Sequence, residues 1–442
     1  MTNLLTEVLK HEVYPAMGCT EPIAVAFCSA NAAKLLLPDK VISVNIKMDP
    51  GTYKNGLAVA LPNTRGEKGN LMAAALGAVM AGPEAGSAIF NDLAASDLTK
   101  ARAMLRKKAV SITIDYAKKG IYISAEVRSA GHKALCEIKN SHSAVTLLKK
   151  DGREIMRKKA GTSAADSPPE AEQANVTGKN SAPYKSVLRK TDFKKLFKEI
   201  EAITPAQLAY IKEGVKLNLA ASKEGLKIKK VGYYISDLIA KGYIKKDILS
   251  TAKLTTAAAT DARMAGAPLP VMSSGQSGNQ GVVAILVPYL VGKAFKVPEK
   301  RILKSIALSH LVNAYIKVYT GELAPICGCA VAAGVGAAVA IVWQRKGANL
   351  KAATLAVNNL ISDLGGTLCD GAKSGCALKV ASSSDSAIRA AYMAINGEGI
   401  SELEGFIGKT AEETIKNIAL ISKTGMAKVD RVILEIMSAK NM

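Results

Sequence analysis

The stretches PICGCA (residues 325–330) and TLCDGAKSGC (residues 367–376) carry four of the chain's seven cysteines. Their spacing fits neither a CxxC zinc ribbon nor the closely spaced cysteines of a ferredoxin. Both stretches place cysteine beside glycine and alanine, which lets a backbone pack closely around an inorganic cluster. We therefore predict an iron–sulfur cluster that is held by three cysteines and leaves one iron open for substrate.

The composition indicates a large protein with aliphatic cores. At 442 residues the chain is long enough for two or three domains. Apolar residues make up 49% of it and aromatic residues only 5%, which favours close-packed helices over a β-sandwich. The formal charge of +22 could attract nucleic acid or a carboxylate substrate, but no stretch interleaves the scattered lysines with stacking aromatics. We therefore expect a solvated lysine surface and no nucleic-acid partner.

Cysteine usage and the apolar stretches indicate in which cellular compartment the protein is expected. Seven cysteines are too few, and odd in number, for a secreted disulfide framework, and residues 1–11 lack a signal-peptide pattern. Two uncharged stretches, residues 264–292 and 323–344, are long enough to span a membrane. The first has a polar centre that would be costly in lipid, and the second consists mostly of alanine and glycine. We expect buried elements of a soluble, cytoplasmic protein with no membrane partner.

The turn PAMGCTEP (residues 15–22) separates a predicted helix over 2–14 from an alanine-rich helix over 23–36. Thr20 is the expected N-cap of the second helix. Cys19 would then lie at a helix N-terminus, where the dipole lowers a thiol pKa and favours the thiolate. The alternative for Cys19 is an ordinary buried cysteine.

Alternating apolar residues from position 41 onward predict an α+β domain over residues 1–150. His132 lies at a turn and His142 opens a strand in the last part of this domain, and both are kept as candidates, because adjacent strands could bring them to one face. Helices are expected at about 71–80 and 86–106. The predicted strands cover residues 41–46, 57–61, 110–115, 121–127, 134–140 and 143–149, with a turn at 53–56.

The rest of the chain changes character twice. Residues 151–185 are small, polar and proline-containing, which predicts a flexible linker or surface insertion. Residues 186–442 carry apolar residues at helical spacing almost throughout. The expected fold class is therefore α+β, with an N-terminal α+β domain followed by an all-helical, cluster-binding catalytic domain.

The glycine-rich stretch SSGQSGNQG (residues 273–281) precedes an apolar helix. Free backbone amides at a helix N-terminus, together with hydroxyl and amide side chains, favour an anion site. No lysine follows the glycines as a P-loop requires, so a substrate carboxylate is the expected ligand. The alternative is a tight loop that satisfies its own backbone. The candidate substrate-binding residues are Ser274, Gly275, Ser277, Asn279 and Gln280.

Four motifs in order resemble the L-cysteine desulfidase family, which is related to the iron–sulfur L-serine dehydratases. They are GCTEP at 18–22, DARMAG at 261–266, SGNQG at 277–281 and CDGAxxxCAxK at 369–379. The resemblance covers nearly the whole chain apart from about 150–185. It implies an α+β domain joined to a helical domain and a [4Fe-4S] enzyme that converts L-cysteine to pyruvate, ammonia and hydrogen sulfide.

The resemblance also implies roles for individual residues. Related serine dehydratases use a C-terminal cysteine trio with a Cys-Asp member, which implies Cys327, Cys369 and Cys376 as cluster ligands. Cys19 belongs to the desulfidase motif and is a candidate ligand or the catalytic base. The polar loop, with Asn55, would hold the α-carboxylate of a small amino-acid substrate. An open iron would polarise the C–S bond as a Lewis acid.

The remaining cysteines are expected to have no role in the site. Cys28 and Cys136 are predicted to be structural. A helix is expected over about 329–346, and if it has begun at Cys329, this side chain points away from Cys327. A homodimer is expected from enzymes of this size.

Three alternatives stay open. The nearest is an iron–sulfur L-serine dehydratase, with the same cluster and a hydroxyl leaving group. A different class is a non-catalytic protein that binds sulfide or a metal such as zinc, although the wide cysteine spacing argues against zinc. Pyridoxal phosphate offers a third route to the same elimination, through a Schiff base with one of many lysines.

Overall fold

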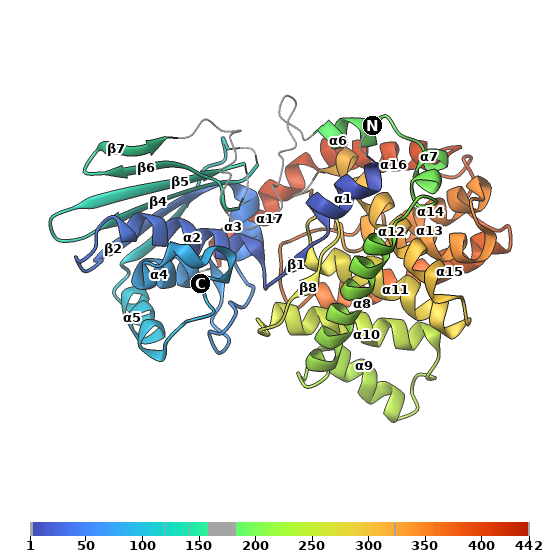
Figure 1. The fold of residues 1–442 in the computed structure, drawn as a ribbon, viewed down its shortest axis with the longest axis horizontal. Helices are drawn as coiled ribbons and strands as arrows, with labels where there is room; N and C mark the ends of the chain where they lie inside the picture. The colour runs from blue at the N-terminus through green and yellow to red at the C-terminus, as the bar shows by residue number, and fades with distance from the viewer. Residues whose placement is uncertain (1–2, 119, 141, 158–182, 322–323, 441–442) are drawn as a thin grey trace.

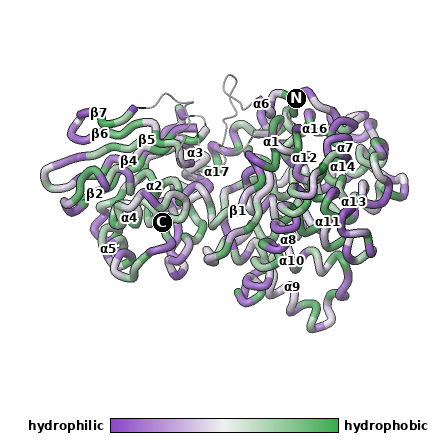
Figure 2. The backbone as a smooth tube through the Cα atoms, in the orientation of Figure 1, coloured by the Kyte–Doolittle hydropathy of each residue, from purple (hydrophilic) through white to green (hydrophobic). Residues whose placement is uncertain are grey.

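The computed structural model describes residues 3–118, 120–140, 142–157, 183–321 and 324–440. It has a sheet-containing N-terminal part and a larger helical part, which confirms the predicted fold class (Figure 1). Apolar residues run through the chain in both parts (Figure 2). Among the described residues, no helix combines the length and the apolar character needed to cross a membrane.

The N-terminal part is built on a six-stranded sheet with the order β3-β2-β4-β5-β6-β7. β2 pairs with β3 in parallel, and the other neighbours are antiparallel. Val44, Ile46 and Met48 of β2 are buried while the residues between them are exposed, as a strand with one covered face requires. The strands are β2 (Ser43–Met48), β3 (Val110–Ile114), β4 (Tyr122–Arg128), β5 (Lys133–Lys139), β6 (Val145–Lys150) and β7 (Arg153–Arg157).

Two alanine-rich helices, α2 (Thr20–Lys34) and α4 (Gly69–Met80), pack against each other and against this sheet. Their apolar residues join those of β2, β4 and β5 in one core. Short side chains let the helices approach the sheet closely. The remaining elements of this part are α3 (Pro50–Gly56), η1 (Pro83–Ala88) and α5 (Ala95–Arg106).

The structure corrects the prediction for residues 53–61. The expected turn at 53–56 belongs to α3, and the expected strand at 57–61 is reduced to a single bridge between Ala60 and Lys68. Asp49 explains the helix, because its side chain accepts from the Thr52 amide and Pro50 occupies the first helical turn. Strand β7 and the start of α6 (Pro183–Arg189) fall within the segment 151–185, whose middle, 158–182, lies outside the described residues.

The helical part surrounds three buried helices: α11 (Gly278–Ala294), α12 (Glu299–Thr320) and α13 (Ala332–Lys346). The two long uncharged stretches of the sequence supply much of α11 and α13, as expected for a buried core. The other helices are α7 (Phe193–Glu199), α8 (Pro205–Gly225), α9 (Val231–Ala240), α10 (Ile248–Met264), α14 (Leu350–Leu364), α15 (Cys376–Ile395) and α16 (Ala411–Leu420).

The two ends of the chain cross between the parts. Helix α1 (Leu4–Glu12) contributes its apolar face to the core of the helical part, and β1 (Pro15–Ala16) pairs there with β8 (Val271–Met272). Conversely, the C-terminal helix α17 (Ala427–Ala439) reaches α3 of the N-terminal part (Figure 1). The short π-helical segment Ile421–Gly425 joins α16 to α17.

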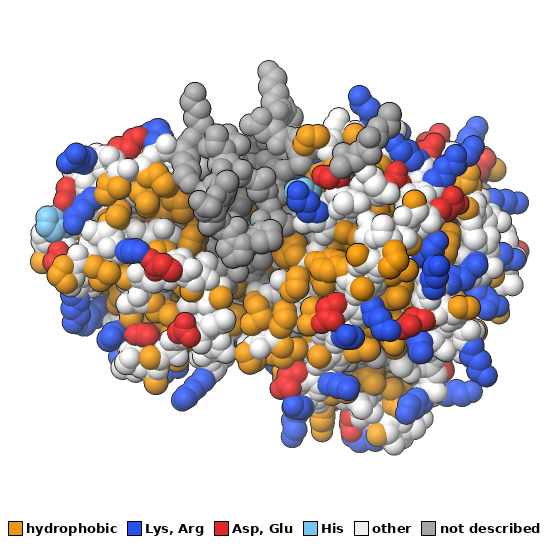
Figure 3. All heavy atoms as spheres, viewed as in Figure 1, with side chains coloured by type: hydrophobic (Ala, Val, Ile, Leu, Met, Phe, Trp, Pro, Cys, Tyr) orange, Lys and Arg blue, Asp and Glu red, His pale blue; other side chains and the backbone are white. Residues whose placement is uncertain are grey.

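Surface charge is mixed on the visible face. Lys and Arg side chains are spread over both parts and interspersed with Asp and Glu (Figure 3). On this face the positive excess therefore does not gather into one patch.

Candidate functional site

A cavity of about 640 Å³ lies between the two parts and is lined by both. The N-terminal part contributes the start of α2 and Asn55, and the helical part contributes the start of α11 and both cysteine stretches. The predicted site residues that line it are Cys19, Asn55, Ser277, Asn279, Gln280, Cys327, Cys369 and Cys376.

A backbone bridge brings the two cysteine stretches together. Ile326 pairs with Leu368 in an antiparallel bridge. The Cys327 amide donates to the Thr367 carbonyl at 2.8 Å, and the Cys369 amide donates to the Pro325 carbonyl at 2.7 Å. Residues that are 42 positions apart in the sequence therefore open onto the same cavity.

The loop between Cys369 and Cys376 is tightly constrained. Gly371 has φ +89°, and a Cβ on it would lie 2.2 Å from the Lys54 carbonyl oxygen, so only glycine fits. Lys379 donates to the Asp370 carboxylate at 2.7 Å and holds the start of the loop. The geometry explains why glycine, aspartate and lysine accompany the cysteines in this motif.

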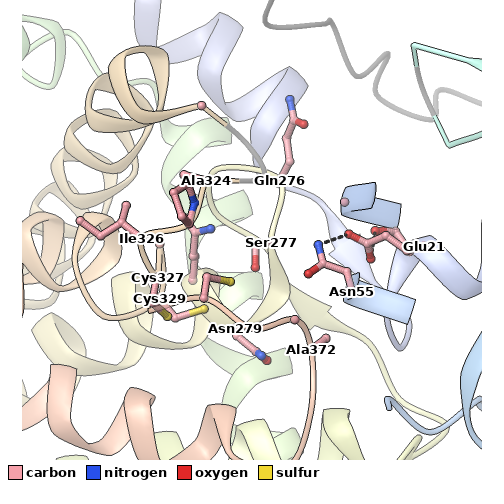
Figure 4. Close-up of a pocket in the computed structure, with 18 of the residues that line it drawn as sticks. Glu21, Asn55, Gln276, Ser277, Asn279, Ala324, Ile326, Cys327, Cys329 and Ala372 are labelled. Carbon is pink, nitrogen blue, oxygen red and sulfur yellow. Dashed lines mark hydrogen bonds between the residues drawn. The ribbon is translucent and has the colours of Figure 1, made fainter. Parts of the chain in front are cut away.

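The other two cysteines of interest complete the cluster of thiols. Cys19 packs with Cys376, Val59 and Met264 in a small apolar group. Cys329 lines the cavity beside Cys327, because the helix expected from residue 329 has not yet begun there (Figure 4). Helix α13 begins only at Ala332, so the chain from Cys327 to Cys329 is a turn and both side chains can face inward. Cys28 and Cys136 lie instead in the core under the sheet, as predicted.

Burial and thiol contacts raise the pKa values of the three predicted C-terminal ligands, Cys327, Cys369 and Cys376. Contact with the Cys329 thiol, together with burial, raises the pKa of Cys327 to about 12. The Cys327 contact and burial raise the pKa of Cys369, and burial raises that of Cys376. Because a metal ligand must be a thiolate, cluster binding here would release protons.

Cys19 does lie at a helix N-terminus, but it is the N-cap itself, and Thr20 is the first helical residue. The predicted thiolate is not found. Burial raises the pKa of Cys19 well above its usual value, and the Glu21 carboxylate raises it further. Both effects outweigh the helix dipole, because the thiol is buried beside an anion.

The three predicted ligand cysteines line one cavity without converging on a single point. Within the part of the chain that the structure describes, no three His, Cys, Asp or Glu side chains converge closely enough to hold one metal ion. Cys327, Cys369 and Cys376 instead line one shared cavity. A cluster distributes its thiolates over several irons and needs such an arrangement around a space rather than around a point.

The N-terminal side of the cavity carries a buried carboxylate, Glu21. It accepts from the Cys19 thiol at 2.8 Å and from the Asn55 amide at 3.0 Å (Figure 4). Burial would raise the pKa of Glu21, but His142 and the hydrogen bonds from Cys19 and Asn55 hold it below its usual value. Glu21 is therefore an ionised group inside the cavity.

The two candidate histidines are separated. His142 lines the cavity near Glu21, whereas His132 lies on the surface, where its Nδ1 is 2.7 Å from Asp151. The structure therefore does not bring the two imidazoles to one site.

The polar loop divides into lining and supporting residues. Ser277, Asn279 and Gln280 line the cavity. Ser274 is fully buried behind them, where Asn313 donates to its hydroxyl at 2.9 Å. The Gly275 carbonyl accepts from the Lys317 ammonium at 2.6 Å. Ser274 and Gly275, which were expected to touch substrate, thus hold the loop in place.

Sequence reasoning assigned no role to Arg263 or Glu21, although both stand in the quoted motifs. Arg263 lines the cavity from the end of α10, and its Nη1 donates to the Asn279 side-chain oxygen at 3.2 Å. A charged residue in an otherwise small and apolar helical stretch was the available signal. Asp261, two residues earlier, accepts from the Gly232 amide at 2.8 Å and so anchors α9.

A buried lysine joins the N-terminal part to the cysteine loop and to the last helix. Lys54 donates to the Cys369 carbonyl at 3.1 Å and to the Asp430 carboxylate at 2.6 Å. Its side chain is only 2% exposed. The backbone of Cys369 is thus fixed by a residue from α3.

Comparisons with known proteins bear on this site. The model of the family described as serine dehydratase alpha chain matches residues 154–435, a range that contains Arg263, the polar loop and three of the candidate ligand cysteines. A UPF0597 protein of Elusimicrobium minutum is 52% identical over 438 residues, and one of Geobacter sulfurreducens is 50% identical over 438 residues. A UPF0597 protein of Alkaliphilus oremlandii is 37% identical over 442 residues. Each alignment covers 99% of both chains.

Proposed function

The chain belongs to the serine dehydratase alpha chain family, and on this premise we propose that it catalyses β-elimination of L-cysteine to pyruvate, ammonia and hydrogen sulfide. The family membership suggests a lyase of the serine dehydratase type. The observation that carries the proposal is the convergence of five cysteine thiols, a buried carboxylate and a polar helix N-terminus on one cavity. Two motifs that resemble the L-cysteine desulfidases, at 18–22 and 369–379, supply part of that lining.

We assign Cys327, Cys369 and Cys376 as the residues that would hold a [4Fe-4S] cluster. Cys327 and Cys369 come from the two paired loops of the helical part, and Cys376 is the first residue of α15. When bound, an iron with an open position would supply a Lewis acid for the leaving group, for which thiolate sulfur is a suitable soft donor.

We assign proton transfer at Cα to the Cys19–Glu21 pair. The thiol carries a proton and donates it across 2.8 Å to an ionised carboxylate. In our scheme Sγ passes this proton to Glu21 as it accepts the proton from Cα. The β-substituent leaves with the electrons of its bond to Cβ, and the resulting aminoacrylate tautomerises and hydrolyses to pyruvate and ammonia. Asn55 orients the carboxylate through its side-chain amide.

The experiment measures pyruvate and sulfide released from L-cysteine by anaerobically purified, full-length protein. We expect equal amounts of the two products and loss of turnover when iron is removed. Turnover that persists in iron-free protein would contradict the assignment and point to pyridoxal phosphate instead. Bound zinc without any turnover would favour the metal-binding protein.

L-Serine is the second candidate substrate, because the matching family model is that of a serine dehydratase. The same site would eliminate hydroxide in place of sulfide. Comparing kcat/KM for L-cysteine and L-serine on one preparation separates the two. The proposal expects L-cysteine to be preferred.

A further inference from the structure

Arg263 is a buried cation, only 6% exposed, that forms no salt bridge within the part of the chain that the structure describes. Its Nη1 donates to a neutral partner, the Asn279 side-chain oxygen. Asp261 faces α9 instead, where it accepts from the Gly232 amide. The Nε of Arg263 also has no hydrogen-bond partner. A buried charge without a charged partner is costly, so an anionic ligand in the cavity would be a favourable partner for this guanidinium.

Arg263 lies against the start of α11, which is itself electropositive. A Cβ on Gly278 would lie 2.3 Å from the Arg263 Nε, so glycine at this position makes room for the guanidinium. Ser277 is the N-cap, and its side chain makes no capping hydrogen bond. The first amides of a helix have no intrahelical partner and favour an anion, whereas a cation beside them is unfavourable. The Arg263 guanidinium and the N-terminal amides of α11, both electropositive, therefore share one wall of the cavity.

The wall of the cavity that carries Arg263 also holds a hydrogen-bond acceptor without a donor, the Gln280 side-chain oxygen. This wall lies opposite the Glu21 carboxylate. Gln280 is buried, its Oε1 has no partner, and it lines the cavity with Asn279. In Figure 4, Ser277 lies between the sulfurs of Cys327 and Cys329 on one side and the Glu21–Asn55 pair on the other. A ligand bound here would meet a cationic wall on one side and the Glu21 carboxylate on another.

We propose that Arg263, with the N-terminal turn of α11, binds the α-carboxylate of the substrate and sets specificity for free amino acids. The guanidinium would offer its fork to the two carboxylate oxygens, with Asn279 orienting it. The ionised Glu21 is the opposing group that suits the α-ammonium. The identity of the ligand rests on the proposed function, but the anion site itself does not.

The test is calorimetric binding of L-alanine, which has both charged groups but no leaving group, to full-length, anaerobically purified protein. L-Alaninamide, which lacks the carboxylate, is the matched ligand. We expect L-alanine to bind wild type and L-alaninamide to bind at least about tenfold more weakly. Arg263→Gln should raise the Kd for L-alanine at least about tenfold, and Arg263→Lys should raise it less, because lysine keeps the charge but loses the fork.

Arg389→Gln is the control, because Arg389 is an exposed residue of α15 that pairs with Asp385. It should bind L-alanine as wild type does. No binding of L-alanine to wild type, or an unchanged Kd in both Arg263 variants, would overturn the proposal. Loss of iron from Arg263→Gln with an unchanged Kd would also overturn it and make Arg263 a counter-charge of the cluster.

The two proposals fail separately. Binding of L-alanine that depends on Arg263, without turnover of L-cysteine or L-serine, would support the carboxylate site and contradict the lyase. Turnover with an unchanged KM in Arg263→Gln would support the lyase and contradict the carboxylate site.

Discussion

At the residue scale, the pairing of a thiol with a carboxylate decides how Cys19 can act. Its position at a helix N-terminus favours a thiolate, but burial and Glu21 raise its pKa and keep the proton on sulfur. Such a thiol becomes a base only if its neighbour takes the proton. Glu21 can do so, because hydrogen bonds and His142 keep it ionised.

Cys19→Ser and Glu21→Gln test this relay. Each should lower kcat for L-cysteine about 10²- to 10⁴-fold, the usual contribution of a general base. Both should keep their iron, whereas Cys376→Ser should lose it. Loss of iron from Cys19→Ser would show that Cys19 is a ligand. An unchanged kcat in either variant would show that the substituted residue takes no part in proton transfer.

His310 makes a second residue-scale prediction, for stability against pH. Burial lowers the pKa of His310 to about 3, so the folded protein keeps it neutral. The unfolded chain binds a proton near pH 6.5, so stability falls as pH drops below that value. Between pH 7 and pH 5 this accounts for about 2 kcal/mol of unfolding free energy.

Urea unfolding of wild type and His310→Gln at both pH values measures the effect. The variant should lose less stability on acidification than wild type, because it lacks the buried imidazole. Equal pH dependence in the two proteins would show that His310 is protonated in the fold.

At the element scale, the paired cysteine loops are what the sequence could not supply. Glycine and cysteine in both stretches indicated a cluster, but only the bridge between Ile326 and Leu368 shows that they share a cavity. Spacing alone does not predict an isolated bridge between two loops. It also placed the helix start at Cys329, three residues before α13 begins.

Local signals predicted most elements because their periodicities are strong. The long helices of the core and the strands β2 to β6 were found from apolar spacing. Residues 53–61 failed because tyrosine, asparagine and glycine indicated a turn, while the Asp49 cap and Pro50 start a helix. The sequence could not divide the polar loop, because a residue that faces the cavity looks the same as one that packs against Asn313 or Lys317, as Ser274 and Gly275 do.

Gly371→Ala tests whether the tight loop positions the ligands. Alanine would be strained at φ +89°, and its Cβ would clash with the Lys54 carbonyl oxygen. We therefore expect a loss of about 1–3 kcal/mol of stability and a loss of iron. Gly397→Ala is the matched control, because Gly397 has φ +86° with nothing within 4 Å. It should show the backbone strain alone and keep its iron. Iron content and urea unfolding curves are measured for both variants. Equal iron loss in the two would contradict a role of the Lys54 contact in positioning the ligands.

At the scale of the whole molecule, the cavity depends on elements from both ends of the chain. Lys54 of α3 holds the Cys369 carbonyl and the Asp430 carboxylate of α17. Amphipathic spacing predicted α17 as a helix but could not show that it returns to the N-terminal part. Contacts between residues that are hundreds of positions apart leave no periodic signal in the sequence.

Asp430→Asn tests this connection. The substitution leaves the Lys54 ammonium buried without its charged partner. We expect the unfolding free energy to fall by about 1–3 kcal/mol. This is less than for a fully buried pair, because Asp430 is 32% exposed. Asp363→Asn, which breaks an exposed pair with Arg389, should cost less than about 1 kcal/mol. Equal losses in urea unfolding would contradict the structural role of the Lys54–Asp430 pair.

The central claim is that the thiols gathered in this cavity hold the cluster on which a lyase activity depends. The most direct measurement is iron and acid-labile sulfide in anaerobically purified wild type, Cys369→Ser and Cys28→Ser, with pyruvate release from L-cysteine on the same samples. We expect about four irons and four sulfides per chain in wild type and in Cys28→Ser, with turnover in both, and neither cluster nor turnover in Cys369→Ser. Wild-type turnover in Cys369→Ser, or turnover in wild type without iron, would contradict the account.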